Sequence, residues 1–217
     1  MSQQPVAFYL RDQTLWLSAE KCIFWEENKA LILSDLHLGK TGHFRKEGIG
    51  VPQQLLEQDL LRLDGQIKLF SPSSLIIIGD LFHSRKNLEV NFFSKWRTKH
   101  HATAMHLIPG NHDILSPEIY KELNIVLHEK EWDLPPFTFT HELSNEIPDH
   151  QYQIAGHVHP GIRLNGKGKQ KLRLPCYYFT NQGALLPAFG KFTGMHVIEA
   201  SKDATIFALG DNEIIKF

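Results

Sequence analysis

The sequence has few features of secreted, disulfide-bonded or zinc-stabilised proteins. It has two cysteines in 217 residues, Cys22 and Cys176, and no Cys-x-x-Cys pair or cysteine and histidine spacing typical of structural zinc. It also begins without a basic segment followed by an apolar stretch, so we expect no secretion signal. We therefore expect two ordinary, half-buried thiols in a cytoplasmic protein.

Long apolar runs are missing as well. The longest strong run, residues 75–78, is far shorter than the roughly 18 residues that suggest a membrane span, so we expect no membrane partner. Hydrophobic residues make up 42% of the chain and charged residues 22%, which allows a sizeable core and excludes disorder as the main state. At roughly 150 residues per domain, the length predicts a single domain over residues 1–217.

Net charge is nearly absent, whereas histidine is abundant. With 23 basic and 24 acidic residues, the net charge is −1, so any affinity for nucleic acid must come from local basic groups. The chain has 13 histidines, and only His100 and His101 are adjacent, which excludes a purification tag. Histidine in this amount indicates metal binding.

The hydrophobic pattern predicts strands that alternate with helices in the first half. Three short strands come first, at residues 7–10, 14–17 and 22–25. Three short apolar runs, typical of strands buried on both faces, follow at residues 31–33, 75–78 and 105–108. Apolar residues at helical spacing predict helices between them, at residues 52–70 and 87–99. This alternation predicts a parallel sheet with right-handed crossovers.

Strand patterns dominate the second half. The expected strands are residues 137–140, 152–155, 162–164, 171–174, 177–180, 195–200 and 205–209, with an Asn165-Gly166 turn between the third and the fourth. We therefore expect an α+β fold in which two mixed β-sheets pack face to face with flanking helices. Ligands in such sheets bind beyond the carboxyl ends of the parallel strands.

Polar motifs follow the predicted strands at that end. In chain order they are Asp35-x-His37, Gly79-Asp80, Gly110-Asn111-His112-Asp113, His141 and Gly156-His157-x-His159. Each motif alone has a bland explanation, such as a surface charge beside an imidazole or a polar turn. All five in this order, each after a predicted strand, indicate a dinuclear metal centre. Mixed carboxylate, imidazole and amide ligands suit manganese, iron or zinc better than magnesium or calcium.

These five motifs resemble the signature of the calcineurin-like metallophosphoesterases, over about residues 31–160. A narrower resemblance, to the DNA-ligase-associated metallophosphoesterases, covers nearly the whole chain. It is carried by Asp35-Leu36-His37-Leu38-Gly39-Lys40 with His43-Phe44-Arg45, by Leu174-Pro175-Cys176 and by Leu186-Pro187-Ala188-Phe189-Gly190-x-Phe192-Thr193-Gly194. The resemblance implies an αββα sandwich, hydrolysis of phosphodiesters by two divalent metals, manganese first, and DNA, an ATP-dependent DNA ligase and other repair proteins as partners.

The resemblance also implies which residue does what. One metal would take Asp35, His37, Asp80 and His159, and the other would take Asp80, Asn111, His141 and His157, with Asp80 bridging. Such a pair, about 3.5–4 Å apart, can clamp the attacking and leaving oxygens of an in-line displacement. Asn111 can also turn its amide NH₂ toward a phosphoryl oxygen.

Two further histidines are candidates for proton transfer. His112 follows a candidate ligand, and as imidazolium it can protonate the leaving alkoxide; the alternative is a histidine that caps a turn. His83 lies three residues after Asp80, as in the nuclease subunit of the double-strand-break repair complex, where it supports the acid. The alternative for His83 is a plain packed histidine. Asp113 is expected to fix the loop backbone rather than to react.

Substrate binding has the weakest pattern. His43 and Arg45 lie with Lys40 and Lys46 in a basic segment after the first motif, where they can hold phosphate oxygens. Lys169, Lys171 and Arg173 share one face of the predicted hairpin by their spacing of two residues and can form a rail for DNA phosphates. The alternatives are a solvated cationic loop and a lysine-rich edge that blocks strand pairing. No motif for reading bases is evident.

Three functions remain open at this point. The first is a manganese-type phosphodiesterase that acts on nucleic acid, a DNA nuclease linked to repair. The second is a small-substrate phosphohydrolase, either a cyclic-nucleotide-like diesterase or a nucleotide-lipid pyrophosphatase. The third is an inactive interaction subunit, against which the intact His112 and all seven ligands argue.

Overall fold

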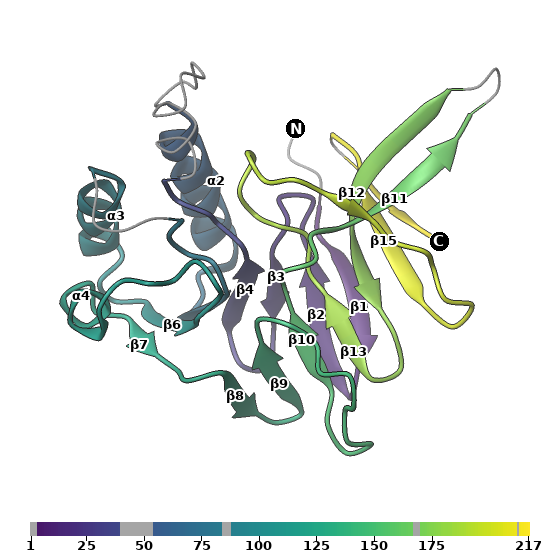
Figure 1. Ribbon diagram of the computed structural model, residues 1–217, viewed down its shortest axis with the longest axis horizontal. Helices are drawn as coiled ribbons and strands as arrows, with labels where there is room; N and C mark the ends of the chain where they lie inside the picture. Colours follow the sequence, from purple (N-terminus) through teal and green to yellow (C-terminus); the bar gives the residue numbers. More distant parts are fainter. Residues whose placement is uncertain (1–3, 40–53, 84–87, 167–169, 212) are drawn as a thin grey trace.

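The computed structural model describes residues 4–39, 54–83, 88–166, 170–211 and 213–217. Two β-sheets lie against each other, and helices α2 (Gln54–Phe70), α3 (Leu88–Lys99) and α4 (Pro117–Glu122) lie beside the first sheet (Figure 1). None of the helices in the described ranges is both long and apolar enough to cross a membrane.

The first sheet has seven strands that follow one another in chain order. They are β1 (Val6–Leu10), β2 (Gln13–Leu17), β3 (Ile23–Trp25), β4 (Ala30–Ser34), β5 (Ser74–Ile78), β6 (Ala104–Ile108) and β7 (Val126–Leu127). Strands β1 to β4 are antiparallel and β4 to β7 are parallel. The helices α2 and α3 connect β4, β5 and β6, as the alternation in the sequence predicts.

The second sheet has nine strands. They are β8 (Glu131–Leu134), β9 (Phe137–Thr140), β10 (Gln153–Ala155), β11 (Pro160–Asn165), β12 (Lys171–Phe179), β13 (Gly183–Leu185), β14 (His196–Val197), β15 (Thr205–Leu209) and β16 (Ile214–Lys216). Strands β9, β10 and β13 are parallel, and β12 is antiparallel to β11, β13 and β15. Both sheets are therefore mixed, and the predicted α+β class with two face-to-face sheets is confirmed.

Alternation of side chains along the buried strands produces the layers. Ile32 of β4 packs between the sheets with residues such as Phe139 of β9. Its neighbour Leu33 points to the other face and packs with Leu63 of α2 and Phe93 of α3. All five residues of β4 are buried, as expected for a strand covered on both faces.

The described helices cover only one of the two outer faces. The outer face of the second sheet packs a smaller cluster that includes Ile162, Cys176 and Ile206. In the described ranges, no helix lies on that face, so the flanking helices that the sequence predicts lie on the first sheet.

Proline and short strands account for the differences between predicted and observed elements. Residues 171–174 and 177–180 belong to one strand, β12, which continues through Pro175 opposite Gly161. The predicted strand at residues 195–200 is reduced to β14. The short elements α4, β7, β8, β13 and β16 were not predicted, because two to six residues give too little periodicity to detect.

Candidate metal centre

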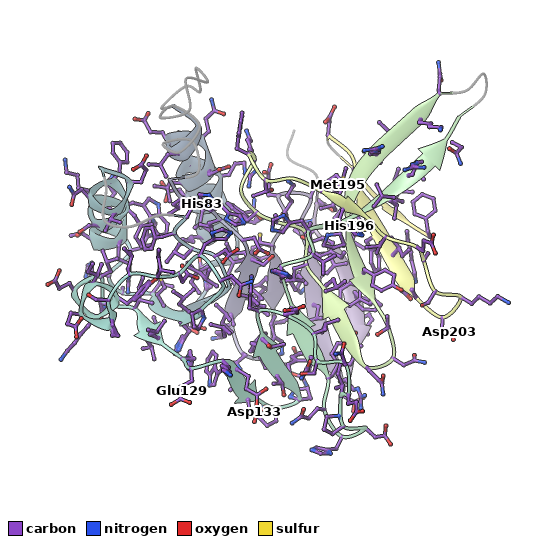
Figure 2. All side chains as sticks on the ribbon, viewed as in Figure 1. His83, Glu129, Asp133, Met195, His196 and Asp203 are labelled. Carbon is purple, nitrogen blue, oxygen red and sulfur yellow. The ribbon has the colours of Figure 1, made fainter. Side chains whose placement is uncertain are left out.

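The two sheets meet at the end where the polar motifs follow their strands. Ser34, the last residue of β4, forms a parallel bridge with Ala188, which follows β13 in the second sheet. Asp35 and His37 follow β4, and His157 and His159 follow β10. In Figure 2, His83 lies on the side of α2 and α3, and Met195 and His196 lie on the side of the second sheet.

Candidate ligand atoms gather in two overlapping groups. The first group is Asp35, His37 and His159, and the second is Asp35, Asp80 and His141; within each group these atoms lie within 4.8 Å of one another. His159 Nε2 lies 3.5 Å from Asp35 Oδ1, and His37 Nε2 lies 3.5 Å from Asp80 Oδ2. Ligand atoms bound to one ion at about 2.1 Å are separated by roughly 3.0–3.5 Å, so these spacings suit a shared cation.

The two carboxylates lie between the groups. Asp80 Oδ2 is 3.9 Å from His141 Nε2, and Asp35 Oδ1 is 4.0 Å from His141 Nδ1. Asp35 is the residue common to both groups, whereas the sequence resemblance gives the bridging role to Asp80. Asp80 also faces a member of each group, His37 and His141, so its bridging role stays a prediction.

A buried polar atom tests whether these residues fit a metal. Asp35 is fully buried, and among the described residues its Oδ1 has no hydrogen-bond partner. The Nδ1 atom of His141 is also buried and has no hydrogen-bond partner within the described part of the chain. The other oxygen, Asp35 Oδ2, accepts from His157 N at 3.0 Å. Because a buried carboxylate oxygen without a partner is costly, a divalent cation between Asp35 Oδ1 and His141 Nδ1 would satisfy both atoms, and the residues fit the predicted metals.

The backbone around the ligands is held in an unusual conformation. The φ angle is positive at five of the seven predicted ligands: Asp35 (51°), His37 (48°), Asp80 (45°), His157 (62°) and His159 (52°). Residues other than glycine adopt such angles rarely, and they concentrate at functional sites, where the surrounding structure holds them. Backbone hydrogen bonds supply that support here, since His37 N donates to Asp80 O at 2.8 Å and Asp35 N donates to Gly79 O at 3.2 Å.

The imidazoles at the centre are oriented by their second nitrogen. His159 Nδ1 donates to the carbonyl of Gly194 at 3.1 Å, which leaves Nε2 as the lone-pair atom that faces Asp35. His157 Nδ1 lies 3.1 Å from His141 Nε2. Burial lowers the pKa of His141, although the carboxylates of Asp35 and Asp80 oppose this shift. The neutral form that burial favours is the form that binds metals.

His112 lies at the open side of the centre. Its backbone N–H donates to Asp80 Oδ1 at 2.9 Å, and its side chain is exposed. Its ring centroid lies 4.4 Å from that of the half-buried His83 and 5.5 Å from that of His37. This placement suits a proton donor that reaches a substrate, with His83 beside it, and both roles stay predictions. Asn111, the preceding residue, is also exposed.

Asp113 fixes the loop that carries Asn111 and His112. Its carboxylate accepts three backbone hydrogen bonds, from the N–H groups of Leu81, Phe82 and Gly110. Burial raises the pKa of Asp113 to about 6, and these hydrogen bonds oppose the rise. The structural role expected for Asp113 agrees with these contacts.

The predicted substrate-binding residues are only partly described. His43, Arg45 and Lys169 lie outside the described residues. Lys171 and Arg173 are exposed on the hairpin of β11 and β12, which projects from the body (Figure 1). The register of the hairpin places Arg173 directly opposite Arg163, which is exposed as well. The alternation of residues in the sequence alone does not predict this pair.

Two charged residues of α2, which the sequence did not indicate, hold the segment of residues 189–191 that contacts Asp35. Asp59 accepts from the backbone N–H of Lys191, and Arg62 donates to the carbonyl of Phe189 at 2.6 Å. The adjacent Gly190 N–H donates to Asp35 O at 3.1 Å. Asp59 and Arg62 are three residues apart, a spacing too common in helices to reveal this supporting role. The only signal in the sequence is that this charged pair lies on the buried side of the predicted helix.

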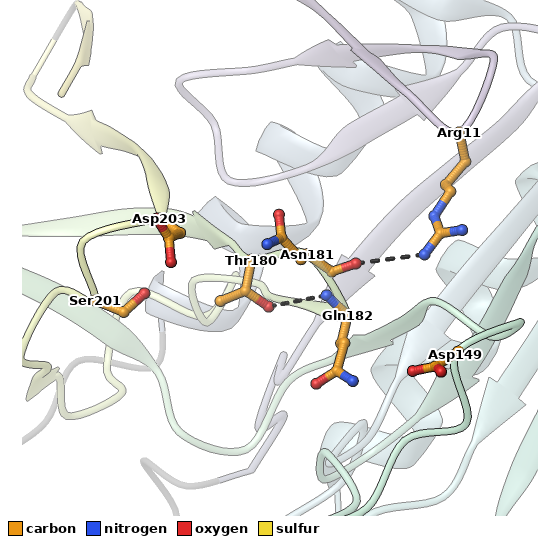
Figure 3. Close-up of a pocket in the computed structure, with 7 residues that line it drawn as sticks. All are labelled: Arg11, Asp149, Thr180, Asn181, Gln182, Ser201 and Asp203. Atoms are coloured by element: carbon orange, nitrogen blue, oxygen red, sulfur yellow. Dashed lines mark hydrogen bonds between the residues drawn. The ribbon is translucent and has the colours of Figure 1, made fainter.

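A separate hollow of about 480 Å³ lies away from this centre (Figure 3). It is lined by Arg11, Asp149, Thr180, Asn181, Gln182, Ser201 and Asp203. Gln182 and Thr180 precede β13, whose first residue pairs with the first residue of β10. The hollow therefore lies at the amino ends of these strands, opposite the metal motifs.

Two mixed sheets with aspartates and histidines at their shared end are the arrangement that the resemblance to metallophosphoesterases implies. Among solved structures, the chain is similar to the nuclease MPE of Pseudomonas putida, with 32% sequence identity, a TM-score of 0.82, and coverage of 97% of this chain and 100% of that chain. The chain belongs to the family of that nuclease, within the calcineurin-like metallophosphoesterases.

The E. coli phosphoesterase Yfce aligns over 87% of this chain and 97% of its own, with 15% identity and a TM-score of 0.44. No protein-family model and no curated protein matches the chain.

Proposed function

We propose that the protein is a metal-dependent phosphodiesterase that cleaves DNA. The observation that carries the proposal is the cluster of Asp35, Asp80 and three histidines at the end of both sheets. The 32% identity to a nuclease over nearly the whole chain favours nucleic acid as the substrate. DNA repair in the cytoplasm, with an ATP-dependent DNA ligase as partner, is the setting that the sequence resemblance suggests.

The residues at the centre would have different roles in the hydrolysis. Two divalent ions, manganese by preference, would supply Lewis-acid charge to the phosphoryl oxygens and activate water as the nucleophile. Asn111 would hold a phosphoryl oxygen by its amide NH₂. His112 would donate a proton to the leaving oxygen, which otherwise departs as a poorly stabilised alkoxide. The neighbouring His83 would hold the His112 ring in place.

The basic hairpin favours a polymeric substrate. β11 begins directly after His159, so Arg163 lies about 13 Å along the strand from that candidate ligand. Like charges directly opposite each other destabilise a hairpin, and Arg163 and Arg173 form such a pair. If one phosphate of a nucleic acid occupies the metal centre, another phosphate of the same strand could bind between the two arginines and relieve this repulsion.

A cleavage panel tests the proposal. With manganese, the wild type should cleave DNA and bis(para-nitrophenyl) phosphate, and it should cleave para-nitrophenyl phosphate, a mono-ester, more slowly. Cleavage of the small diester without cleavage of DNA or RNA would favour the small-substrate phosphohydrolase. Metal binding without hydrolysis of any ester would favour the inactive subunit.

A further inference from the structure

We propose that Phe192 stacks on a nucleobase next to the phosphate that is cleaved. This inference rests on the proposed function, because it assigns a binding residue to a nucleic-acid substrate. Phe192 lies in the loop of residues 190–194, which belongs to the segment shared with the DNA-ligase-associated resemblance but which has no role among the candidate ligands.

Both ends of this loop are tied to candidate metal ligands. At its start, Gly190 N donates to Asp35 O at 3.1 Å. At its end, the carbonyl of Gly194 accepts from His159 Nδ1 at 3.1 Å. Phe192 is two residues from either end, and two residues of extended chain span at most about 7 Å. The backbone of Phe192 therefore lies close to the candidate metal ligands.

The loop is fixed before any substrate arrives. From α2, Asp59 accepts from Lys191 N at 3.3–3.4 Å, and Arg62 donates to the carbonyl that precedes the loop. Within the loop, Thr193 Oγ1 donates to Gly190 O at 2.8 Å. A platform that is already ordered loses little entropy when a ligand binds to it, so the ring can contribute most of its contact energy to binding.

The two phenylalanines of this segment differ in exposure. Phe189, three residues earlier, is fully buried, with the Arg62 guanidinium 4.2 Å from its ring centre. Phe192 is 46% exposed. One aromatic ring of the segment is therefore in the core, and the other is partly exposed in the loop tied to Asp35 and His159.

A nucleic acid matches this surface better than a protein or a lipid. Arg163 and Arg173 provide positive charge on the hairpin that follows His159, and Phe192 provides an exposed ring in the loop whose Gly194 carbonyl accepts from His159. A basic track combined with an exposed ring is the arrangement that holds phosphates and bases together. Stacking of one base is expected to change affinity by roughly ten-fold to a hundred-fold.

Matched small substrates test the role directly. The para-nitrophenyl esters of thymidine 3′-phosphate and 5′-phosphate share their leaving group with the corresponding esters of abasic deoxyribose phosphate and differ only in the base. Phe192→Ala should raise KM for at least one thymidine ester by roughly ten-fold to a hundred-fold, with little change for its abasic counterpart. Phe192→Trp should restore the wild-type KM. Phe92→Ala, at an exposed ring on α3, is the control and should change neither substrate.

The outcomes separate this inference from the proposed function. Equal effects of Phe192→Ala on the thymidine and abasic esters, while the wild type hydrolyses both, would overturn the stacking role and leave the phosphodiesterase intact. Absence of hydrolysis of every diester by the metal-loaded wild type would overturn the proposed function and the stacking role together.

Discussion

Glycines beside the candidate ligands leave no room for a side chain. A Cβ atom on Gly79 would lie 1.7 Å from His141 Nδ1, and one on Gly156 would lie 2.4 Å from Asp35 Oδ2. Gly79 also has a φ of +74°, which L-residues rarely adopt. At the scale of single residues, the centre thus requires glycine at these two positions as well as the ligands themselves.

Gly79→Ala is therefore expected to displace His141 and to weaken metal binding. Metal analysis after exposure to manganese and dialysis should show fewer bound ions than in the wild type, and DNA cleavage should fall with them. Gly65→Ala is the control, because nothing lies within 4 Å of a Cβ at this position of α2. It should keep the metals and stabilise the protein by about 0.5–1 kcal/mol in urea unfolding. Wild-type metal content in Gly79→Ala would contradict the packing argument.

His112→Ala separates proton donation from metal binding. His112 is exposed and belongs to neither group of candidate ligands, so the variant should keep its metals. Turnover should fall by about 10²–10⁴-fold on substrates with alkoxide leaving groups, which is the usual effect of a general acid. The loss should be smaller with a nitrophenolate leaving group, which needs less protonation. An equal loss on both substrates would instead assign His112 to phosphate binding.

Residue types and their order allow much of the centre to be predicted, but not its geometry. Asp35, His37, Asp80, His141 and His159 gather as expected, because each follows a strand of the same rim. The positive φ angles and the position of Asp35 in both groups could not be predicted. They depend on hydrogen bonds between loops that are distant in the sequence, such as that from His37 N to Asp80 O.

The projecting hairpin is the element whose charge is most open to a test. Replacement of Arg163, Lys171 and Arg173 by glutamine should raise KM for DNA and flatten its salt dependence. The log–log slope should fall by about 0.7–0.9 for each phosphate contact that is lost. Hydrolysis of bis(para-nitrophenyl) phosphate should not change, because this substrate is too short to reach Arg163 from the centre.

Glutamines at Lys95, Lys99 and Lys121 provide the control for the hairpin variant. These lysines are exposed on α3 and α4, so the same charge is removed at a distance from the hairpin. This control should keep the wild-type salt slope. An unchanged slope in the hairpin variant would contradict the proposed phosphate rail. An equally reduced slope in both variants would contradict it too, because net charge alone would then explain the effect.

Helices and strands could be predicted best where they are long or have a clear apolar pattern. The two helices and the three buried parallel strands were predicted within two residues of their described bounds, because apolar periodicity specifies them. Strand β12 was predicted as two strands, because Pro175 lacks the N–H that a ladder uses. Its position opposite Gly161 is set by tertiary pairing, which no local pattern shows.

At the scale of the whole molecule, burial makes the two thiols inert. Cys22 and Cys176 are fully buried, not half-buried as the sequence suggests, and burial raises the pKa of each thiol to about 12. Because only the thiolate reacts readily, both groups stay protonated at pH 8. Ellman's reagent should find no reactive thiol in the native protein and two after guanidinium unfolding. Rapid labelling of the native protein would contradict the burial of both side chains.

At the scale of the whole molecule, the proposed activity depends on metals at the junction of the two sheets. The most direct measurement is the rate of DNA cleavage by metal-free protein as manganese is added, for the wild type and for Asp80→Asn. The wild type should be inactive in chelator and gain activity with manganese until its sites are filled. Asp80→Asn should stay folded and inactive throughout, since it lacks the carboxylate that faces both ligand groups. Cleavage by the metal-free wild type, or wild-type activity in Asp80→Asn, would contradict the account.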